Sequence, residues 1–256
     1  MKNLLLLLIS FLMINVACSA QEKQEFDKSI NILVFTKTSG YRHASISSGL
    51  KMLSDQSKNQ NWVITATEDA SLLRDDFLSH FDVAVFLNPT GDAICDKGQA
   101  AFEKFMKSGK GFVGIHAAAD FEYDWEFYGN LVGGYFLSHP PAQKATVIFE
   151  NFDHPAMKPF KGMKTYTTVD EWYAYKKNPR PNVNVLARLD ESTIKKGRQD
   201  KNEKWRMGDH PLIWWNDKDG IRSFYTVFGH THEAFQDKLI IEHITNAINW
   251  AAKRID

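Results

Sequence analysis

Short apolar runs alternate with segments of helical periodicity through the first half of the chain. Two segments, 43–58 and 97–110, carry hydrophobic residues at helical spacing. Four continuous runs of apolar and branched residues are typical of strands buried on both faces. These runs are 30–35, 62–67, 81–88 and 111–116. Strands that alternate with helices predict an α/β fold whose mostly parallel sheet is covered by helices on both faces.

The second half of the chain is less regular but also carries strand patterns. Three further strands are predicted at 145–150, 183–189 and 211–216. Turn-forming residues at 217–220 predict a hairpin that joins the last of these strands to an antiparallel neighbour within 221–230. An amphipathic helix over 237–254 closes the chain. The charged segment 190–209 has few apolar residues, so we expect either a lid over the site or a solvated excursion.

The first twenty residues have the pattern of a secretory signal peptide. Lys2 precedes an apolar run over 4–14, and small residues follow. This run is too short and wrongly flanked for a membrane span. Cleavage before Cys18 would lipidate its thiol and anchor the protein, whereas cleavage after residue 20 would release it. We therefore expect an exported protein, periplasmic or lipid-anchored, with a linker at 21–29 and one domain at 30–256.

Composition narrows the class of ligand. The 31 basic and 31 acidic side chains leave no formal net charge, so the concentrated positive surface of a nucleic-acid-binding protein is not expected. A small neutral or weakly charged ligand is the expected partner. Cys95 is the only cysteine besides Cys18, and we interpret it as a structural thiol rather than a nucleophile, which would need a base nearby. No glycine loop of a phosphate-cradling spacing is present, and no resident cofactor is expected.

Polar residues follow several of the predicted parallel strands. In such sheets, ligands bind beyond the carboxyl ends of the strands. Tyr41, Arg42 and His43 follow the first strand, Asn88 ends the third and His116 ends the fourth. We expect these side chains at one edge of the sheet, with Tyr41, Arg42, His43 and Asn88 as candidates for contacts with the ligand. His210, later in the chain, is a further candidate for such contacts.

Histidines at strand-to-turn junctions are the main candidates for chemistry. His43, His116, His210 and His230 occupy such positions, and imidazoles that titrate near neutrality can move protons or bind a metal. His116 stands at a tight elbow where many hydrolases carry a nucleophile. Its alternative role is to hold that elbow by a hydrogen bond. Asp120 is placed to orient the imidazole or to stabilise the start of a helix.

Aromatic residues accompany an acidic candidate in the middle of the chain. Glu171 precedes Trp172 and Tyr173, and a carboxyl group against aromatic rings can have a raised pKa and act as an acid. Tyr123 and other aromatics would give a groove flat apolar faces with polar edges, which suit sugar rings. Packing in the core explains these aromatics equally well.

Five motifs in order carry a resemblance to a known family. "TKTSGYRHASI", "GIHAAAD", "DEWY", "HPLIWW" and "YTVFGHTHEAF" resemble the ThuA-like, or trehalose-utilisation, family over about residues 30–251. The resemblance implies the flavodoxin-like fold of class I glutamine amidotransferases. Those enzymes carry a cysteine at the elbow that His116 occupies here. Because a histidine cannot form the thioester that glutamine hydrolysis requires, a glutaminase is not expected.

The resemblance also implies a role in sugar catabolism. It points to disaccharides or their 3-keto derivatives as substrates, with a separate sugar dehydrogenase as a pathway partner. A ketone at C3 acidifies the C2 proton, which His116 would remove. His230 or Glu171 would return a proton to the leaving oxygen, and Arg42 or His43 would hold the enolate.

Two other functions stay open. One is a non-catalytic carbohydrate-binding module that keeps an enzyme-like pocket. The other is a metal-dependent hydrolase whose divalent metal is held by His43, His116, His210 and His230, although their spacing matches no compact zinc motif.

Overall fold

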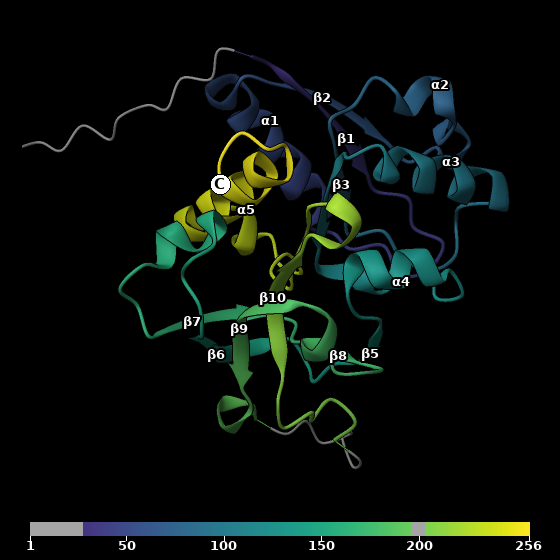
Figure 1. The fold of residues 1–256 in the computed structure, drawn as a ribbon. Helices are drawn as coiled ribbons and strands as arrows, with labels where there is room; N and C mark the ends of the chain where they lie inside the picture. The colour runs from purple at the N-terminus through teal and green to yellow at the C-terminus, as the bar shows by residue number, and fades with distance from the viewer. Residues whose placement is uncertain (1–27, 196–202) are drawn as a thin grey trace, which may run out of the picture.

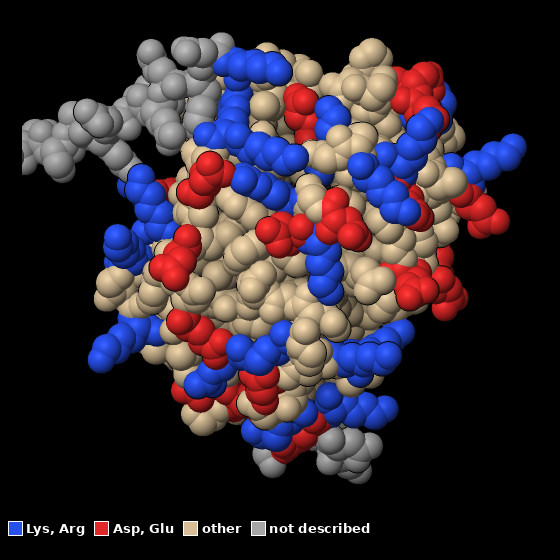
Figure 2. Space-filling model, viewed as in Figure 1, with Lys and Arg blue, Asp and Glu red and all other residues tan. Residues whose placement is uncertain are grey.

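The computed structural model describes residues 28–195 and 203–256. The predicted signal peptide, Cys18 and nearly all of the predicted linker lie outside these residues. No helix in the described part of the chain is long and apolar enough to cross a membrane. Basic and acidic side chains are interspersed over the face shown in Figure 2, as expected from their equal numbers.

A nine-stranded mixed sheet organises the molecule, in the order β2-β1-β3-β4-β11-β10-β9-β6-β7. The first five strands of that order are parallel, and the pairs from β11 to β7 are antiparallel. A second sheet pairs β5 with β8. The strands are β1 (Ile30–Phe35), β2 (Trp62–Thr67), β3 (Val83–Leu87), β4 (Gly111–Ile115), β5 (Phe136–Ser138), β6 (Gln143–Phe149), β7 (Thr165–Asp170), β8 (Ala174–Tyr175), β9 (Asn184–Asp190), β10 (Pro211–Asn216) and β11 (Ser223–Thr226).

Helices cover both sides of the parallel strands. In Figure 1, α1 and α5 lie on one side, and α2, α3 and α4 lie on the other. The α-helices are α1 (Ile46–Gln60), α2 (Asp75–Leu78), α3 (Asp96–Lys107), α4 (Glu126–Val132) and α5 (Lys238–Ala251). Short 3₁₀ turns are η1 (Ala70–Leu72), η2 (His116–Ala119), η3 (Pro155–Phe160), η4 (Arg180–Asn182), η5 (Glu191–Thr193), η6 (Lys218–Gly220) and η7 (Glu233–Phe235).

The core lies between these layers and explains the apolar runs. Every residue of β3 and β4 is buried, because helices cover both faces of the central strands. The C-terminal helix approaches β4 closely at Gly111, where a Cβ atom would lie 2.3 Å from the carbonyl oxygen of Ala251. The absence of a side chain at Gly111 therefore lets α5 lie this close to β4.

The structure confirms the predicted α/β class, the hairpin and the closing helix. β10 and β11 are antiparallel and are joined through η6, and α5 packs its apolar face inward. In the described part of 190–209 only Ile194 and Trp205 are buried, as expected for a segment with few core residues. Residues 196–202, on which the lid prediction mainly depends, lie outside the described residues.

Candidate functional site

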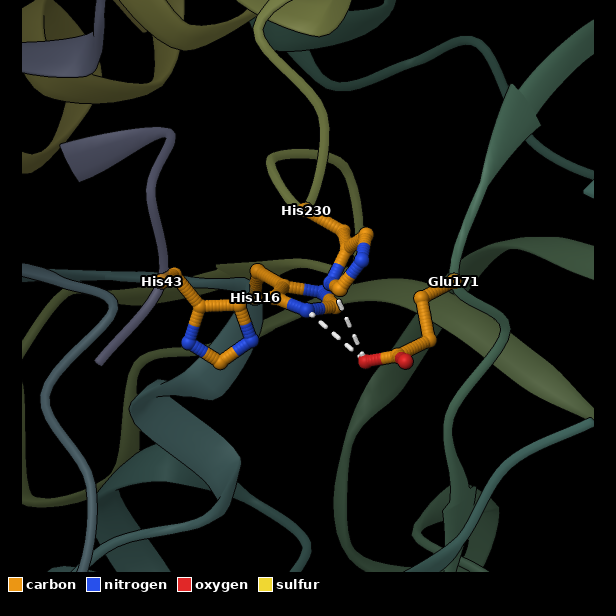
Figure 3. Close-up of side chains that lie close together, drawn as sticks. All are labelled: His43, His116, Glu171 and His230. Carbon is orange, nitrogen blue, oxygen red and sulfur yellow. Dashed lines mark ion pairs between the residues drawn. The ribbon is translucent and has the colours of Figure 1, made fainter. Parts of the chain in front are cut away.

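Three histidines and a glutamate meet at the carboxyl edge of the parallel strands. His43 comes from the loop after β1, His116 directly follows β4, and His230 lies in the loop after β11. Glu171 directly follows β7. One nitrogen or oxygen atom of each side chain lies within 4.8 Å of the others. We call these four residues the His/Glu cluster (Figure 3).

The backbone at His116, directly after β4, points Nε2 of its ring into the cluster. Its backbone φ is 48°, a left-handed conformation that is uncommon for residues other than glycine and concentrates at functional sites. The buried ring donates from Nδ1 to the carbonyl oxygen of Val227 at 2.8 Å. Because a carbonyl only accepts, Nδ1 carries a hydrogen, and in the neutral ring Nε2 carries the lone pair. That Nε2 lies 3.5 Å from Oε2 of Glu171.

A buried carboxylate holds two segments of the cluster together. Asp170, the last residue of β7, accepts backbone N–H bonds from Glu171 at 2.8 Å, from Gly229 at 3.0 Å and from His230 at 3.0 Å. β7 is an edge strand, five places from β4 in the sheet order. These bonds show that its end returns to the loop after β11. Asp170 therefore fixes Glu171 relative to His230.

Charge inside the site centres on Glu171. Its Oε1 lies 3.0 Å from Nδ1 of His139, and its Oε2 lies 3.2 Å from Nδ1 of His230. Burial raises the pKa of Glu171, but His116, His139 and His230 outweigh burial and hold that pKa well below its usual range. Burial lowers the pKa of His139, but the Glu171 carboxylate outweighs burial and raises it, and the same carboxylate raises the pKa of His230. Burial and the neighbouring imidazoles lower the pKa of His43 to about 3, so this ring is neutral at physiological pH.

The other residues predicted after β1 and β3 surround the cluster without joining it. Tyr41 is 66% exposed, and its ring centre lies 4.9 Å from that of His43, so it forms part of the rim. Arg42 is exposed and pairs with Glu68. The amide of Asn88 donates to the carbonyl oxygen of Gly229 at 3.0 Å, which ties the end of β3 to the loop that carries His230.

Asp120 and Tyr123 form a pair of their own beside the cluster. The Tyr123 hydroxyl donates to the Asp120 carboxylate. Asp120 follows η2 rather than lying in the first turn of a helix, so the expectation that it stabilises a helix start is wrong. Burial raises the pKa of Asp120.

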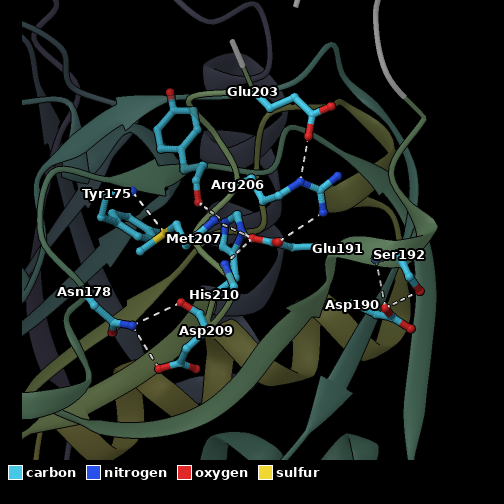
Figure 4. A network of polar contacts seen from close by, with 12 residues as sticks. Tyr175, Asn178, Asp190, Glu191, Ser192, Glu203, Arg206, Met207, Asp209 and His210 are labelled. Atoms are coloured by element: carbon cyan, nitrogen blue, oxygen red, sulfur yellow. Dashed lines mark hydrogen bonds and ion pairs between the residues drawn. The ribbon is translucent and has the colours of Figure 1, made fainter.

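The structure places His210 outside the cluster. Its Nε2 donates to the carbonyl oxygen of Tyr173 at 2.8 Å, and its Nδ1 lies 2.9 Å from Oε1 of Glu191 (Figure 4). The prediction that four histidines converge is therefore wrong for His210. The fourth member of the cluster is Glu171. His210 still supports the site, since the Tyr173 ring packs against His116 with ring centres 4.3 Å apart.

His139 contacts Glu171 from the segment after β5 and could not be predicted as a site residue. No pattern around His139 marks it, because β5 has only three residues and His139 itself is followed by two prolines. Cys95 is exposed at the start of α3, so its expected structural role in packing is not observed. The elbow after β4, where a nucleophile could have been expected, is occupied by His116.

The ligand types in the His/Glu cluster suit two kinds of chemistry. Three imidazoles and a carboxylate can move protons, and they are also a set of ligands that divalent metals such as zinc accept. The buried group could therefore hold a metal ion.

Comparisons with known proteins agree with the fold and name a family. A family model described as ThuA, trehalose utilisation, matches residues 31–251. No curated protein matches the chain in sequence. A ThuA-like protein from Bacteroides uniformis is 24% identical with a TM-score of 0.72, over 89% of this chain and 94% of that one.

Two further structures are similar in fold. A ThuA-like protein from Parabacteroides merdae is 19% identical with a TM-score of 0.70, over 88% of this chain and 90% of that one. A cytoplasmic protein from Salmonella typhimurium is 12% identical with a TM-score of 0.57, over 86% of this chain and 99% of that one. Since the family model spans most of the sequence, the chain belongs to the ThuA family, described by trehalose utilisation.

Proposed function

We propose that the protein converts a sugar at the His/Glu cluster by proton transfer, without a covalent nucleophile. One observation carries this proposal. Within the described residues, Nδ1 of His43, Nε2 of His116 and Nδ1 of His230 are buried in one cluster and make no hydrogen bond, and the last two only face Oε2 of Glu171 at 3.5 Å and 3.2 Å. Leaving such atoms unsatisfied costs free energy, so their retention at one point favours a functional role.

The proposed substrate is a glycoside that carries a ketone at C3, a class that fits a family described by trehalose utilisation. The ketone acidifies the proton at C2. In the proposed reaction the lone pair on Nε2 of His116 takes this proton, the electrons of the C2–H bond form the C1–C2 double bond, and the bond from C1 to the leaving oxygen breaks. His230, which faces Glu171, returns a proton to that oxygen. Each such transfer contributes roughly 10²–10⁴-fold to the rate.

The rim of the cluster fits a sugar ring. Tyr41 is largely exposed next to His43 and offers an apolar face on which a pyranose can stack. Arg42 is the nearby exposed cation, and its release from Glu68 would let it reach an enolate oxygen. These contacts are part of the proposal.

The setting is also proposed rather than established. Export through residues 1–20, with Cys18 as a lipidation site, would place the protein where scavenged sugars arrive. Because the sequence lacks a dinucleotide-binding glycine pattern, oxidation at C3 is assigned to a separate dehydrogenase.

Turnover of a methyl 3-keto-glucoside, followed by proton NMR, tests the proposal. The variant His230→Gln should lose roughly 10²–10⁴-fold in rate. His232→Gln is a matched control, because His232 lies in the same loop but is exposed and contacts Ser48 instead of the cluster. Equal rates for the two variants would contradict the proposal. Broadened sugar signals without conversion by any variant would favour the carbohydrate-binding module.

A further inference from the structure

We infer that the His/Glu cluster is a site for one divalent cation of the zinc class, with His43, His116, His230 and Glu171 as ligands. This inference rests on the proposed function only in taking the same cluster as the reaction centre. It names what occupies that centre and which protein atoms hold it.

The direction of the lone pairs is the first argument. Nδ1 of His116 gives its hydrogen to Val227, so in the neutral ring Nε2 faces Oε2 of Glu171 at 3.5 Å as one lone pair toward another. Two acceptors in this arrangement repel unless a cation or a second ring proton lies between them, and titration with Zn²⁺ separates these two cases. Histidines that bind metals almost always donate their other N–H to a carbonyl or carboxylate, as His116 does here.

The spacing of the candidate ligand atoms is the second argument. A tetrahedral zinc ion with ligands at about 2.0–2.1 Å separates neighbouring ligand atoms by about 3.3 Å. Oε2 of Glu171 lies 3.5 Å from Nε2 of His116 and 3.2 Å from Nδ1 of His230. All four ligand atoms fall within 4.8 Å of one another, so His43 needs only a small movement to complete the set.

The surroundings of Glu171 are the third argument. Its Oε1 faces Nδ1 of His139 at 3.0 Å, which leaves Oε2 for the centre of the cluster. Carboxylate ligands in metal sites are commonly held by a second partner in this way. The side chains of His43 and His116 are 3% and 0% exposed, so their free nitrogens are sheltered from bulk water.

One side of the cluster remains open to a ligand. The side chain of His230 is 23% exposed, whereas that of Glu171 is 9% exposed. A sugar oxygen arriving from the His230 side would raise the coordination number to five, which zinc accepts during catalysis. Nε2 of His116 would be a ligand of a bound cation, so it would act as the base only in the metal-free protein. The cation would supply positive charge that stabilises a negative C3 oxygen.

Metal binding is measured on the full-length protein without a histidine tag. After removal of bound metal with a chelator, calorimetric titration with Zn²⁺ should show one equivalent per chain. Co²⁺ in the same protein should give the strong visible absorption of a tetrahedral site. Glu171→Gln should lose this absorption, and His139→Gln should weaken Zn²⁺ binding by about 10–100-fold. His232→Gln should bind both metals as the parent protein does, and far-UV circular dichroism checks that each variant is folded.

Two results would overturn the inference: no stoichiometric Zn²⁺ or Co²⁺ binding by the parent protein, or equal binding by folded Glu171→Gln and His232→Gln. Failure of the inference and of the proposed function are distinguishable. Undiminished sugar turnover by the metal-free protein would remove the cation from the reaction and leave the proposed function standing. Stoichiometric binding without turnover of any sugar would support the cation site and remove the proposed function.

Discussion

The carboxylate of Asp170 should be a main determinant of both stability and site geometry. It is completely buried and accepts backbone N–H bonds from Glu171, Gly229 and His230. In Asp170→Asn, an oxygen kept at the Oδ1 position preserves the bonds from Glu171 and His230. The new NH₂ group then faces the N–H of Gly229, so a buried donor loses its acceptor.

The size of the effect follows from this geometry. A hydrogen bond to a charged acceptor contributes about 1.5–3 kcal/mol, and an unsatisfied buried donor costs about 1–3 kcal/mol. These figures overlap rather than add, so we expect Asp170→Asn to lower the free energy of unfolding by about 2–3 kcal/mol. For a chain of this size that corresponds to a Tm lower by about 4–12 °C. Because Gly229, the residue before His230, loses its bond to the end of β7, His230 is held less firmly and sugar turnover should also fall by more than about tenfold.

Thermal unfolding followed by circular dichroism measures the change in stability. Asp190→Asn is the matched control, because Asp190 also ends a strand but caps an exposed turn at Ser192. We expect this control to lose about 1 kcal/mol or less. The reasoning is refuted if Asp170→Asn unfolds within about 0.5 kcal/mol of the parent protein, or if both variants lose the same amount.

Three further predictions concern the framework of the site. Burial lowers the pKa of His243 from 6.5 to about 4, so its contribution to stability is present above pH 6.5 and is lost as the pH falls through 4. Between pH 7 and pH 5, the free energy of unfolding measured with urea should therefore fall by about 2 kcal/mol less in His243→Gln than in the parent protein. Equal decreases in the two proteins would contradict this. Glu191→Ala leaves His210 and two backbone N–H groups without their acceptor, and should lower the free energy of unfolding by about 3 kcal/mol, as a denaturant titration can measure. Gly111→Ala pushes a methyl group against the Ala251 carbonyl and should lower the free energy of unfolding by about 1–3 kcal/mol. An unchanged Tm would contradict this, because it would mean that α5 can move away from β4 without loss of stability.

The parallel half of the fold follows directly from the sequence. β1, β3 and β4 are buried on both faces and read as continuous apolar runs, so the positions of their carboxyl ends can be predicted. Those positions are enough to bring His43 and His116 to one edge of the sheet, and His230 reaches the same edge because β11 pairs parallel with β4. β7 and β5 carry no comparable signal. β7 is an edge strand whose exposed and covered residues alternate, and β5 has three residues.

The composition of the site was harder to predict than its position. Glu171 joins the cluster only because the end of β7 returns to the loop after β11, a contact between segments about 60 residues apart. His210 illustrates the opposite case. It precedes β10, which runs antiparallel to β11 and therefore starts at the edge where β11 ends. Glu191 and Tyr173 bind it there, beside the cluster, so a shared sheet edge did not mean a shared site.

The most direct test of the central claim follows the C2 proton of a methyl 3-keto-glucoside by NMR in buffered D₂O. The account predicts that the parent protein and His232→Gln exchange this proton for deuterium or release the methanol. His116→Asn should do neither faster than buffer alone. Exchange by folded His116→Asn at the parent rate, or no exchange by the parent protein, would contradict a proton-transfer site at the His/Glu cluster.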